Sequence, residues 1–474
     1  MPTYLSARRS DTVYDGITPA VRHFPDATAA VIASVMLVYL LPFRLVFPPL
    51  SDLGKPGLMV GFGLLVWWAL SRLHPTLVTR GQQPMRWAMA IYLVSLFLSY
   101  VAGQGRGMPV LEANGAERTL LMALAGAGIL LAAADGVLTR DRVDRVLRWF
   151  CWGATFMAFV ALVQFVTRID LTTYLKLPPL LTFHKEVVGF RDRGGDGLVR
   201  VAGTAGHYIE FSVLMVIGLV VAIHFARFSA TRRDRQIYGA LAMFQAGVIP
   251  ISLSRTGVLA LGAAILLLVL LWPLRTTFNV LVVGCLLTAL IQVARPGLLA
   301  AIKSLLLAGE SDPSVRARVE DYDYVAPFIR ERPWLGRGVG TFLPELYQLL
   351  DNQWLTTLVQ GGIIGVAGLA VLFLAGVVVA GRVRRFARTE RDRDLAATLA
   401  VAIGVAAFSG FTFDSMYFST FFVTVHVLLG LTGALWRLTR AERANRIESG
   451  RADRVGSGHR AGSGDEPAAA VARA

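Results

Sequence analysis

The sequence predicts an all-α polytopic membrane protein with about twelve transmembrane helices, both termini cytoplasmic and a partly helical extracytoplasmic cap. The first observation behind this fold class is composition. The 474 residues are 55% hydrophobic and only 17% charged, which is less polar surface than a soluble domain of this size needs, and the mean hydropathy is +0.56. The second observation is a series of uncharged runs, many close to the roughly twenty residues that cross a bilayer core.

Twelve apolar runs divide the chain. Residues 1–26 form a polar cytoplasmic segment without an apolar core, so no cleavable signal peptide is expected; 27–440 form the transmembrane domain; and 441–474, rich in Arg, Gly, Ser and Ala, are predicted to be a disordered cytoplasmic tail. The two shortest runs are also compatible with one re-entrant unit (237–251 and 257–272). The predicted spans lie near residues 27–46, 57–71, 87–102, 119–134, 149–167, 208–226, 237–251, 257–272, 278–293, 354–380, 395–413 and 417–436.

The distribution of basic residues, the third observation, sets the orientation. Arginine clusters at 140–148, 227–235 and 382–393 all fall on the side of the two termini, whereas the short loops on the other side hold few basic residues. This is the positive-inside pattern of a multi-pass plasma-membrane protein. It explains the net charge of +15 without nucleic acid as a partner. Cys151 and Cys285 both lie inside spans, so neither a disulfide framework nor a cysteine metal site is expected.

Two long loops, 168–206 and 294–353, face outward in this topology, and loops of such length are usually functional or disordered. The second contains a predicted amphipathic helix, for which Asp312 is the N-cap and Pro313 the first helical residue. Pro327 is expected to kink or end it. We expect a small cap on the outer membrane surface. The apolar face of the helix is predicted to hold Val315, Val319, Tyr322, Ala326 and Ile329.

Two patches of polar residues belong to the first half of the outer surface. Arg200 comes shortly before the sixth span, where His207 and Glu210 lie three residues apart on one helical face. Two metal-ligand types without a third are a weak indication of a metal site, and neither metal nor cofactor is expected. Arg255 lies in a tight outer turn. An arginine at a helix end commonly extends to lipid headgroups, but a charge in so short a turn is costly without a partner.

Two more patches lie in the second long loop. Arg318 is on the predicted cap helix, and Arg337 falls within a glycine-rich run, 336–340, that lacks the Gly-Lys-Ser/Thr ending of a Walker motif. Asp351 and Asn352 lead into the next span. A further carboxylate in the last outer turn and a histidine deep in the last span are expected to be solvated and packed, respectively (Asp414 and His426).

In order, common face and loop placement, these patches resemble the O-antigen ligase and polymerase superfamily of bacterial polysaccharide assembly. The resemblance covers most of the chain from about residue 200 to residue 380, and each motif alone is loose. The matching residues are Arg200 with Gly203 and His207, Ser254-Arg255, Arg318 fifteen residues before Pro333, the run Pro-Trp-Leu-Gly-Arg-Gly-Val-Gly-Thr-Phe that starts at Pro333, and Asp351-Asn352 before a Gly-Ile-Ile-Gly segment.

The resemblance implies a metal-independent glycosyltransferase on the outer leaflet of the bacterial plasma membrane. Its donor would be a glycan on a polyprenyl diphosphate such as undecaprenyl diphosphate, and its acceptor a sugar hydroxyl on another lipid-linked glycan or a different anchor. Arg200, Arg255 and Arg318 would bind the diphosphate, with Arg337 as a weaker fourth, because guanidiniums bind such oxyanions in bidentate fashion. Membrane lipids and other polysaccharide export and chain-length proteins would be partners.

The reaction also needs a base for the acceptor proton. Asp351 stands where ligases of the family usually carry histidine, and Gln360 stands where relatives often have an acidic residue. Asp351 is the base, or it orients the acceptor while His207 or Glu210 takes the proton. The departure at Asp351 favours a polymerase of exopolysaccharide repeat units, with a ligase as the alternative. Two further residues would position the acceptor and the loop: Trp334 and Asn352.

Two rival functions are weighed against this one. A lipid-linked glycan flippase or transporter would suit twelve spans, but such proteins often show repeated halves and polar residues at mid-membrane, whereas here the polar residues gather in two outer loops. A glycosyltransferase that uses a polyprenyl-monophosphate sugar would be expected to carry acidic residues in a substantial first outer loop. That loop, 47–56, is short and offers only Asp52.

Overall fold

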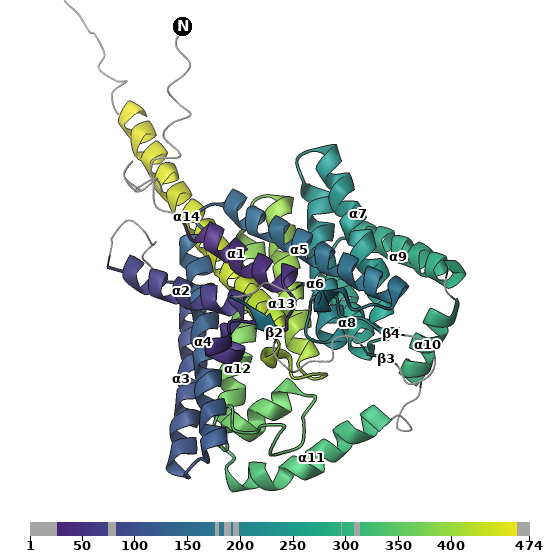
Figure 1. The fold of residues 1–474 in the computed structure, drawn as a ribbon. Coiled ribbons are helices and arrows are strands. Elements are labelled where there is room, and N and C mark those ends of the chain that lie inside the picture. Colours follow the sequence, from purple (N-terminus) through teal and green to yellow (C-terminus); the bar gives the residue numbers. More distant parts are fainter. Residues whose placement is uncertain are drawn as a thin grey trace, which may run out of the picture.

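The computed structural model describes residues 26–73, 82–175, 180–183, 191–192, 199–294, 296–307 and 313–461. Residues 1–25 and 462–474, most of the predicted N-terminal segment and the end of the predicted tail, lie outside them. The described residues form a helical bundle with two very small sheets (Figure 1). The helices are α1 Ala27–Leu40, α2 Pro56–Ser71, α3 Pro84–Gly105, α4 Val110–Gly136, α5 Arg140–Thr167, α6 Tyr208–Phe228, α7 Arg232–Val248, α8 Arg255–Leu271, α9 Leu274–Ala294, α10 Pro296–Leu307, α11 Pro313–Glu331, α12 Gln353–Phe386, α13 Glu390–Ser409 and α14 Ser419–Ala461.

Short elements join these helices. Four 3-10 turns are η2 Pro48–Gly54, η3 Leu171–Thr173, η4 Pro250–Ser252 and η6 Ser415–Tyr417. The strands pair antiparallel in two ribbons, β1 Leu45–Val46 with β2 Thr182–Phe183, and β3 Arg191–Asp192 with β4 Val199–Arg200. The second ribbon leads directly into α6.

Seven of the described helices are long and apolar enough to cross a membrane: α3, α4, α5, α6, α9, α12 and α14; α1, α2 and α8 are shorter apolar helices. The prediction of an all-α polytopic membrane protein is confirmed at this level, and each predicted span overlaps one helix. The count of twelve spans and the cytoplasmic placement of the termini stay predictions. Of the seven, α6 and α14 have the largest share of buried residues in their apolar stretch, 89% and 83%. They therefore form the centre of the bundle.

The helix in the second long loop, α11, differs from its prediction. Its proposed cap, Asp312, lies outside the described residues. Pro327 does not end the helix, which continues to Glu331. A proline removes one backbone hydrogen bond, but here Val325 and Phe328 on either side of it pack into one small apolar cluster with α12 and the following loop, and this packing holds the helix together.

The buried face of α11 also differs from the predicted one. Val319 and Tyr322, expected on the apolar face, are 60% and 54% exposed. Asp321 and Val325 are buried instead, at 4% and 0% exposure. The helix rests on the protein through its second half, so burial follows the contacts of that half and not the apolar periodicity of the whole helix.

The helix α12 is broken near its first third. Gly362 has φ 62° and ψ −163°, a left-handed backbone that favours glycine. The loop before α12 lies against this break and takes over its hydrogen bonds. The Ile363 N–H donates to the Pro333 carbonyl at 2.9 Å, and the Arg337 N–H donates to the Val359 carbonyl at 3.0 Å. Broken helices at membrane depth need such replacement partners.

The glycine-rich run serves this close approach. A side chain at Gly340, which has φ 71°, would meet the Gly115 carbonyl of α4 at 2.4 Å. A side chain at Gly336, which has φ 67°, would meet the Gln360 carbonyl of α12 at 2.3 Å. The run is therefore a tightly packed turn between α4 and the break in α12.

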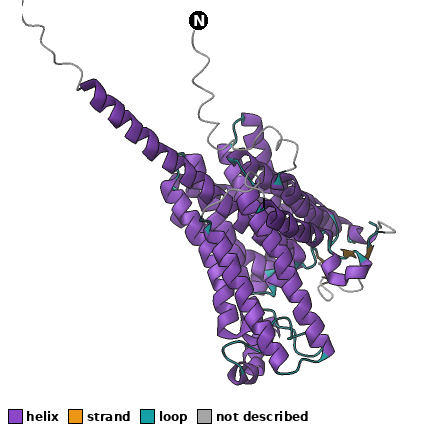
Figure 2. Cartoon of the chain, turned by 90° about the vertical axis from the view of Figure 1, so that its left-hand side faces the viewer, coloured by secondary structure: helices purple, strands orange, loops and turns teal. Residues whose placement is uncertain are grey.

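The last helix, α14, continues well past the bundle. Figure 2 shows it projecting from one end as a single long helix. It runs to Ala461 and so includes residues 441–461, for which the sequence predicts disorder.

Candidate functional site

One arginine and three carboxylates meet where α11 reaches the turn between α13 and α14. Arg318 Nη2 donates to the Thr412 carbonyl at 2.9 Å. Burial raises the pKa values of Asp321 and Asp351, and the charge of Arg318 opposes this rise. Asp321 also accepts a 2.5 Å hydrogen bond from Gln348 Nε2. This group forms the electrostatic centre of the α11 end of the bundle.

The fourth member of the group is Asp414, which was expected to be solvated and is partly exposed in the structure. It lies in the turn just before η6 and lines a cavity. Burial raises its pKa to about 7, and the charge of Asp351 adds to this rise. A carboxyl with a pKa near neutrality exchanges protons readily at physiological pH, which is the property of a general acid or base.

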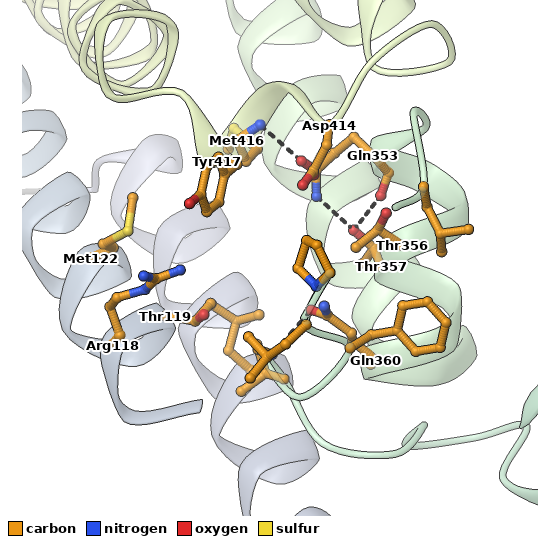
Figure 3. Close-up of a pocket in the computed structure, with 18 of the residues that line it drawn as sticks. Arg118, Thr119, Met122, Gln353, Thr356, Thr357, Gln360, Asp414, Met416 and Tyr417 are labelled. Atoms are coloured by element: carbon orange, nitrogen blue, oxygen red, sulfur yellow. Dashed lines mark hydrogen bonds between the residues drawn. The ribbon is translucent and has the colours of Figure 1, made fainter. Parts of the chain in front are cut away.

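The cavity beside Asp414 has a volume of about 390 Å³ and lies between α3 and α4 on one side and the first turns of α12 on the other. In Figure 3, Arg118 and Thr119 of α4 face Gln353, Thr356 and other residues of α12 across it, with the η6 turn above. Gln353 holds the turn in place: its Oε1 accepts from the Met416 N–H at 2.8 Å.

Two predicted arginines lie around the starts of α6 and α8. Arg200, at the end of β4, donates from Nη1 to the Tyr208 hydroxyl at 2.6 Å and stacks over the same ring. Its buried Nε has no hydrogen-bond partner among the described residues. Arg255 is the first residue of α8, which packs on the first turns of α6, since a side chain at Gly257 would meet Ser212 at 2.6 Å. Arg200 therefore lies at the first residue of α6, and Arg255 at the first residue of α8, where these two helices pack together.

His207 and Glu210 both support the start of α6. His207 is the N-cap, and its Nδ1 accepts from the Ile209 N–H at 3.3 Å. Glu210 is fully buried, and its two carboxylate oxygens accept from the backbone N–H groups of Gly206 and Phe421 at 2.8 and 2.9 Å. Both side chains are therefore engaged in holding the backbone.

The segment between α13 and α14, together with the first turn of α14, connects the two groups. On one side the Thr412 carbonyl accepts from Arg318. On the other side the Phe418 ring lies 6.0 Å from the His207 ring, and the Phe421 N–H donates to Glu210. Arg318 and the start of α6 thus contact the same short segment, which also carries Asp414.

Arg337 lies in a different setting. Its Nη2 donates to the Tyr347 hydroxyl at 2.7 Å and lies 3.8 Å from a carboxylate oxygen of Glu112. Glu112 also forms an ion pair with Arg106, which in turn donates to the Arg337 carbonyl at 2.6 Å. This cluster ties the loop before α12 to the connection between α3 and α4.

The two residues predicted to position the acceptor and the loop behave differently. Asn352 is the N-cap of α12, where its Oδ1 accepts from the Leu355 N–H at 3.1 Å; this fixes the end of the loop next to Asp351. Trp334 is 65% exposed on the loop that lies against the break in α12. Within the described residues, no group of three or more His, Cys, Asp or Glu side chains is placed to hold a metal ion.

Comparison with known proteins supports the resemblance noted in the sequence. Residues 239–370 match the sequence model of a protein family described as O-antigen ligase. The resemblance to the O-antigen ligase and polymerase superfamily is confirmed for this segment. No curated protein matches the chain. The matched segment runs from α7 into α12, past the break at Gly362, and it indicates an O-antigen ligase-like or polymerase-like function.

Within this segment lie Arg255, Arg318 and Asp351; Arg200 and Asp414 lie outside it. Sequence reasoning missed the roles of several residues that the structure brings to the site, chief among them Asp414 and Asp321. Asp321 carried a usable signal, because it lies three residues after Arg318 on the same helical face. Asp414 carried none, since its burial depends on α4 and α12, which are far away in the sequence.

Proposed function

We propose that this protein is a polymerase that joins oligosaccharide repeat units carried on polyprenyl diphosphate, at the outer face of the bacterial plasma membrane. The observation that carries the proposal is the position of Arg318. Arg318 belongs to the matched segment and donates to the Thr412 carbonyl, in the turn that carries Asp414. The charge of Asp351 is close enough to interact with the charge of Arg318. An anion-binding cation and a proton acceptor are the two groups that displacement of a diphosphate by a hydroxyl requires.

Charge distribution supports the outer location. The α11 end of the bundle holds the site, and the arginine clusters at 140–148, 227–235 and 382–393 belong to the opposite helix ends. Basic residues concentrate on the cytoplasmic side of membrane proteins. The site then faces the side on which lipid-linked glycans are assembled into longer chains.

In the proposed reaction, the bond between the anomeric carbon of the donor glycan and the diphosphate oxygen breaks, and its electron pair stays on the diphosphate. The oxygen of the acceptor hydroxyl forms the new bond to the anomeric carbon, and its proton passes to a carboxylate. Arg200, Arg255 and Arg318 stabilise the negative charge that develops on the leaving group. One well-placed donor of this kind contributes about 2.7–4 kcal/mol. We expect these guanidiniums to act without a metal ion.

Asp351 fits the role of proton acceptor better than His207 or Glu210. Glu210 is buried with both oxygens hydrogen-bonded to backbone N–H groups, and His207 caps α6. The Asp351 side chain is accessible to solvent, and partial burial raises the pKa of its carboxyl while Arg318 opposes the rise. A base whose pKa is raised in this way suits the task.

The test uses the natural donor. A strain that lacks the gene should accumulate the lipid-linked oligosaccharide, which can be extracted and given to purified protein in lipid nanodiscs. We expect the wild type to lengthen the glycan, with or without a chelator, and Asp351→Asn to slow lengthening by about 100-fold or more. Asp323→Asn, which changes an exposed carboxylate on α11, is the matched control and should retain activity. No lengthening and no transfer by the wild type would overturn the proposal.

The description of the matched family favours one alternative, a ligase. A ligase would move the glycan from the same donor to an acceptor of another kind, without making longer lipid-linked chains. Adding total membrane lipid from the same strain to the assay separates the two. Transfer that requires this added lipid, at constant glycan length, would identify a ligase.

A further inference from the structure

The cavity beside Asp414 has one wall that recognition of a diphosphate does not explain. The first turns of α12 place four neutral polar side chains on one face, at helical spacing: Gln353, Thr356, Thr357 and Gln360. Hydroxyl and amide groups both donate and accept hydrogen bonds. A wall of this kind suits a ligand that is rich in hydroxyl groups and has no strong charge.

Gln360 is held ready to bind such a ligand. Its Oε1 accepts from the Gly340 N–H at 3.0 Å, and its backbone carbonyl accepts from the Ser99 hydroxyl at 2.9 Å and the Gly338 N–H at 3.0 Å. These bonds fix both the residue and the orientation of its amide. The structure gives Nε2 no acceptor among the described residues, so this donor group is available at the cavity.

The opposite wall provides stacking surfaces. Arg118 of α4 lies with its guanidinium carbon 5.5 Å from the centroid of the Tyr417 ring, and Tyr92 of α3 also lines the cavity. In Figure 3 the Arg118 and Tyr417 side chains lie across the cavity from α12. Flat aromatic faces pack against the C–H face of a sugar ring while its hydroxyls bond to polar neighbours.

The polarity and charge of the lining disfavour the other components of the donor, and its volume suits a sugar. A volume of about 390 Å³ is within the range of about 300–1,000 Å³ for small-molecule sites. A polyprenyl tail would leave the amides and hydroxyls of α12 without partners. A diphosphate would need several cations, whereas here Arg118 shares the cavity with the carboxyl groups of Glu345 and Asp414.

We propose that this cavity binds the terminal sugar of the acceptor glycan, held by Gln360 and Thr356 on α12 and by Arg118 and Tyr417 opposite. Its attacking hydroxyl is directed towards the Asp414 side of the cavity, next to Asp351, the proposed proton acceptor. The proposal rests on the proposed glycosyl transfer and adds the acceptor subsite to it. Two walls of the cavity, α3–α4 and the η6 turn, lie outside residues 239–370, so the subsite combines the matched segment with parts of the chain that the family match does not cover.

The test separates acceptor from donor. Mild acid releases the oligosaccharide from its lipid diphosphate, and the product keeps the acceptor hydroxyls but has no leaving group. This oligosaccharide, with a fluorophore at its reducing end and a diazirine on its terminal sugar, is the probe, and its Kd and photolabelling sites are measured on the full chain in nanodiscs. Binding of inorganic diphosphate is measured in parallel.

We expect labelling on α4 or the first turns of α12. Gln360→Glu keeps the acceptor for Gly340 but removes the amide donor, and we expect it to raise the probe Kd about tenfold without changing the diphosphate Kd. Thr356→Val, nearly isosteric, is a second variant in case the first is unstable. Gln104→Glu, on the exposed end of α3, is the matched control and should bind as the wild type does.

The outcomes distinguish the two proposals. If the wild type lengthens glycans but the probe labels elsewhere, or if Gln360→Glu and Thr356→Val bind the probe as tightly as the control, the acceptor subsite is wrong and the transferase stands. If the wild type neither lengthens nor transfers glycan but the probe labels this cavity, the transferase is wrong and the cavity is a glycan site of another kind.

Discussion

Arginines at the two ends of the bundle are used in different ways. At the end opposite α11, arginines pair with buried carboxylates. Asp135, fully buried, accepts from Arg72 at 2.6 Å and from Arg86 at 2.7 Å, and Asp394 pairs with Arg227 in the same manner. At the α11 end, Arg200 and Arg318 donate to a tyrosine hydroxyl and a backbone carbonyl, which are neutral groups.

The difference separates arginines that hold helices together from arginines that can take an anion. A guanidinium already bonded to a fixed carboxylate has its charge compensated, whereas one bonded to neutral oxygens keeps most of its attraction for an oxyanion. By this criterion Arg337 belongs with the first class although it lies at the α11 end, because Glu112 is beside it. We therefore expect Arg200 and Arg318 to bind the anion and Arg337 to stabilise the loop. Arg318 also lies near the charges of Asp321 and Asp351, but the hydrogen bond that it donates goes to a neutral carbonyl.

The largest effect is expected at Arg318. Arg318→Ala should slow glycan transfer by about 100-fold to 1,000-fold, because a hydrogen-bond donor aimed at the developing charge is lost. The transfer rate of Arg318→Lys should lie between those of the wild type and Arg318→Ala, because lysine keeps the charge but cannot make the bidentate contact of a guanidinium. The matched control is Arg391→Ala, which removes an arginine paired with Asp144 at the other end. Equal losses of transfer in Arg318→Ala and Arg391→Ala would remove the distinction between the two classes.

At Asp135 we expect a loss of stability without a loss of transfer activity. Asp135→Asn leaves Arg72 and Arg86 without their shared counter-charge, and removing one partner of a buried ion pair costs about 3–5 kcal/mol. We expect a lower midpoint of thermal unfolding in detergent, followed by tryptophan fluorescence, and an unchanged transfer rate per folded molecule at low temperature. A variant that unfolds like the wild type, or one that folds normally and has lost activity, would contradict the structural role.

The helices could be predicted from the sequence because they depend on local properties. Runs of apolar residues near the length of a bilayer crossing locate every long helix of the bundle, whatever lies around them. The arginines on the outer loops were found for a similar reason, since basic residues are unusual there. It was the resemblance to the O-antigen ligase and polymerase superfamily that then implied diphosphate binding by Arg318 and Arg200.

The rest of the site depends on contacts between distant parts of the chain. Arg337 was predicted to be a weaker fourth diphosphate-binding residue, and its contact with Glu112 could not be foreseen because Glu112 is 225 residues earlier in the sequence. Asp414 looked solvated, because the helices that enclose it are far away in the chain. The break in α12 at Gly362 depends on a loop that supplies replacement hydrogen bonds. Two adjacent glycines in an apolar run do not by themselves indicate such a loop.

A smaller effect on stability shows whether Arg337 stabilises the loop or binds the diphosphate. If Arg337 and Glu112 stabilise the loop together, Arg337→Ala and Glu112→Gln should each lower the thermal midpoint. The loss of unfolding free energy in the double variant should be smaller than the sum of the two single losses. The coupling free energy of such contacting residues is about 0.5–3 kcal/mol. Purely additive losses, together with a higher Kd for inorganic diphosphate in Arg337→Ala alone, would instead make Arg337 part of the diphosphate site.

A further effect is a pH dependence that comes from Asp414. The folded protein raises the pKa of this carboxyl to about 7, compared with about 3.9 in an unfolded chain. The folded state therefore favours the protonated form, and the stability that it contributes is complete below about pH 4 and is lost as pH rises through about 7. Between pH 5 and pH 8 the thermal midpoint of the wild type should fall, and that of Asp414→Asn should fall less.

Asp351 links this titration to the comparison between the two ends. Because the charge of Asp351 raises the pKa of Asp414, Asp351→Asn should move the fall in stability to lower pH. Replacing a carboxylate at the opposite end, as in Asp144→Asn, should leave its position on the pH axis unchanged. If both variants shift the fall equally, the effect is one of net charge. If only Asp351→Asn shifts it, the two carboxyl groups titrate as neighbours, and the α11 end contains a coupled acid pair beside the arginine that would hold the leaving group.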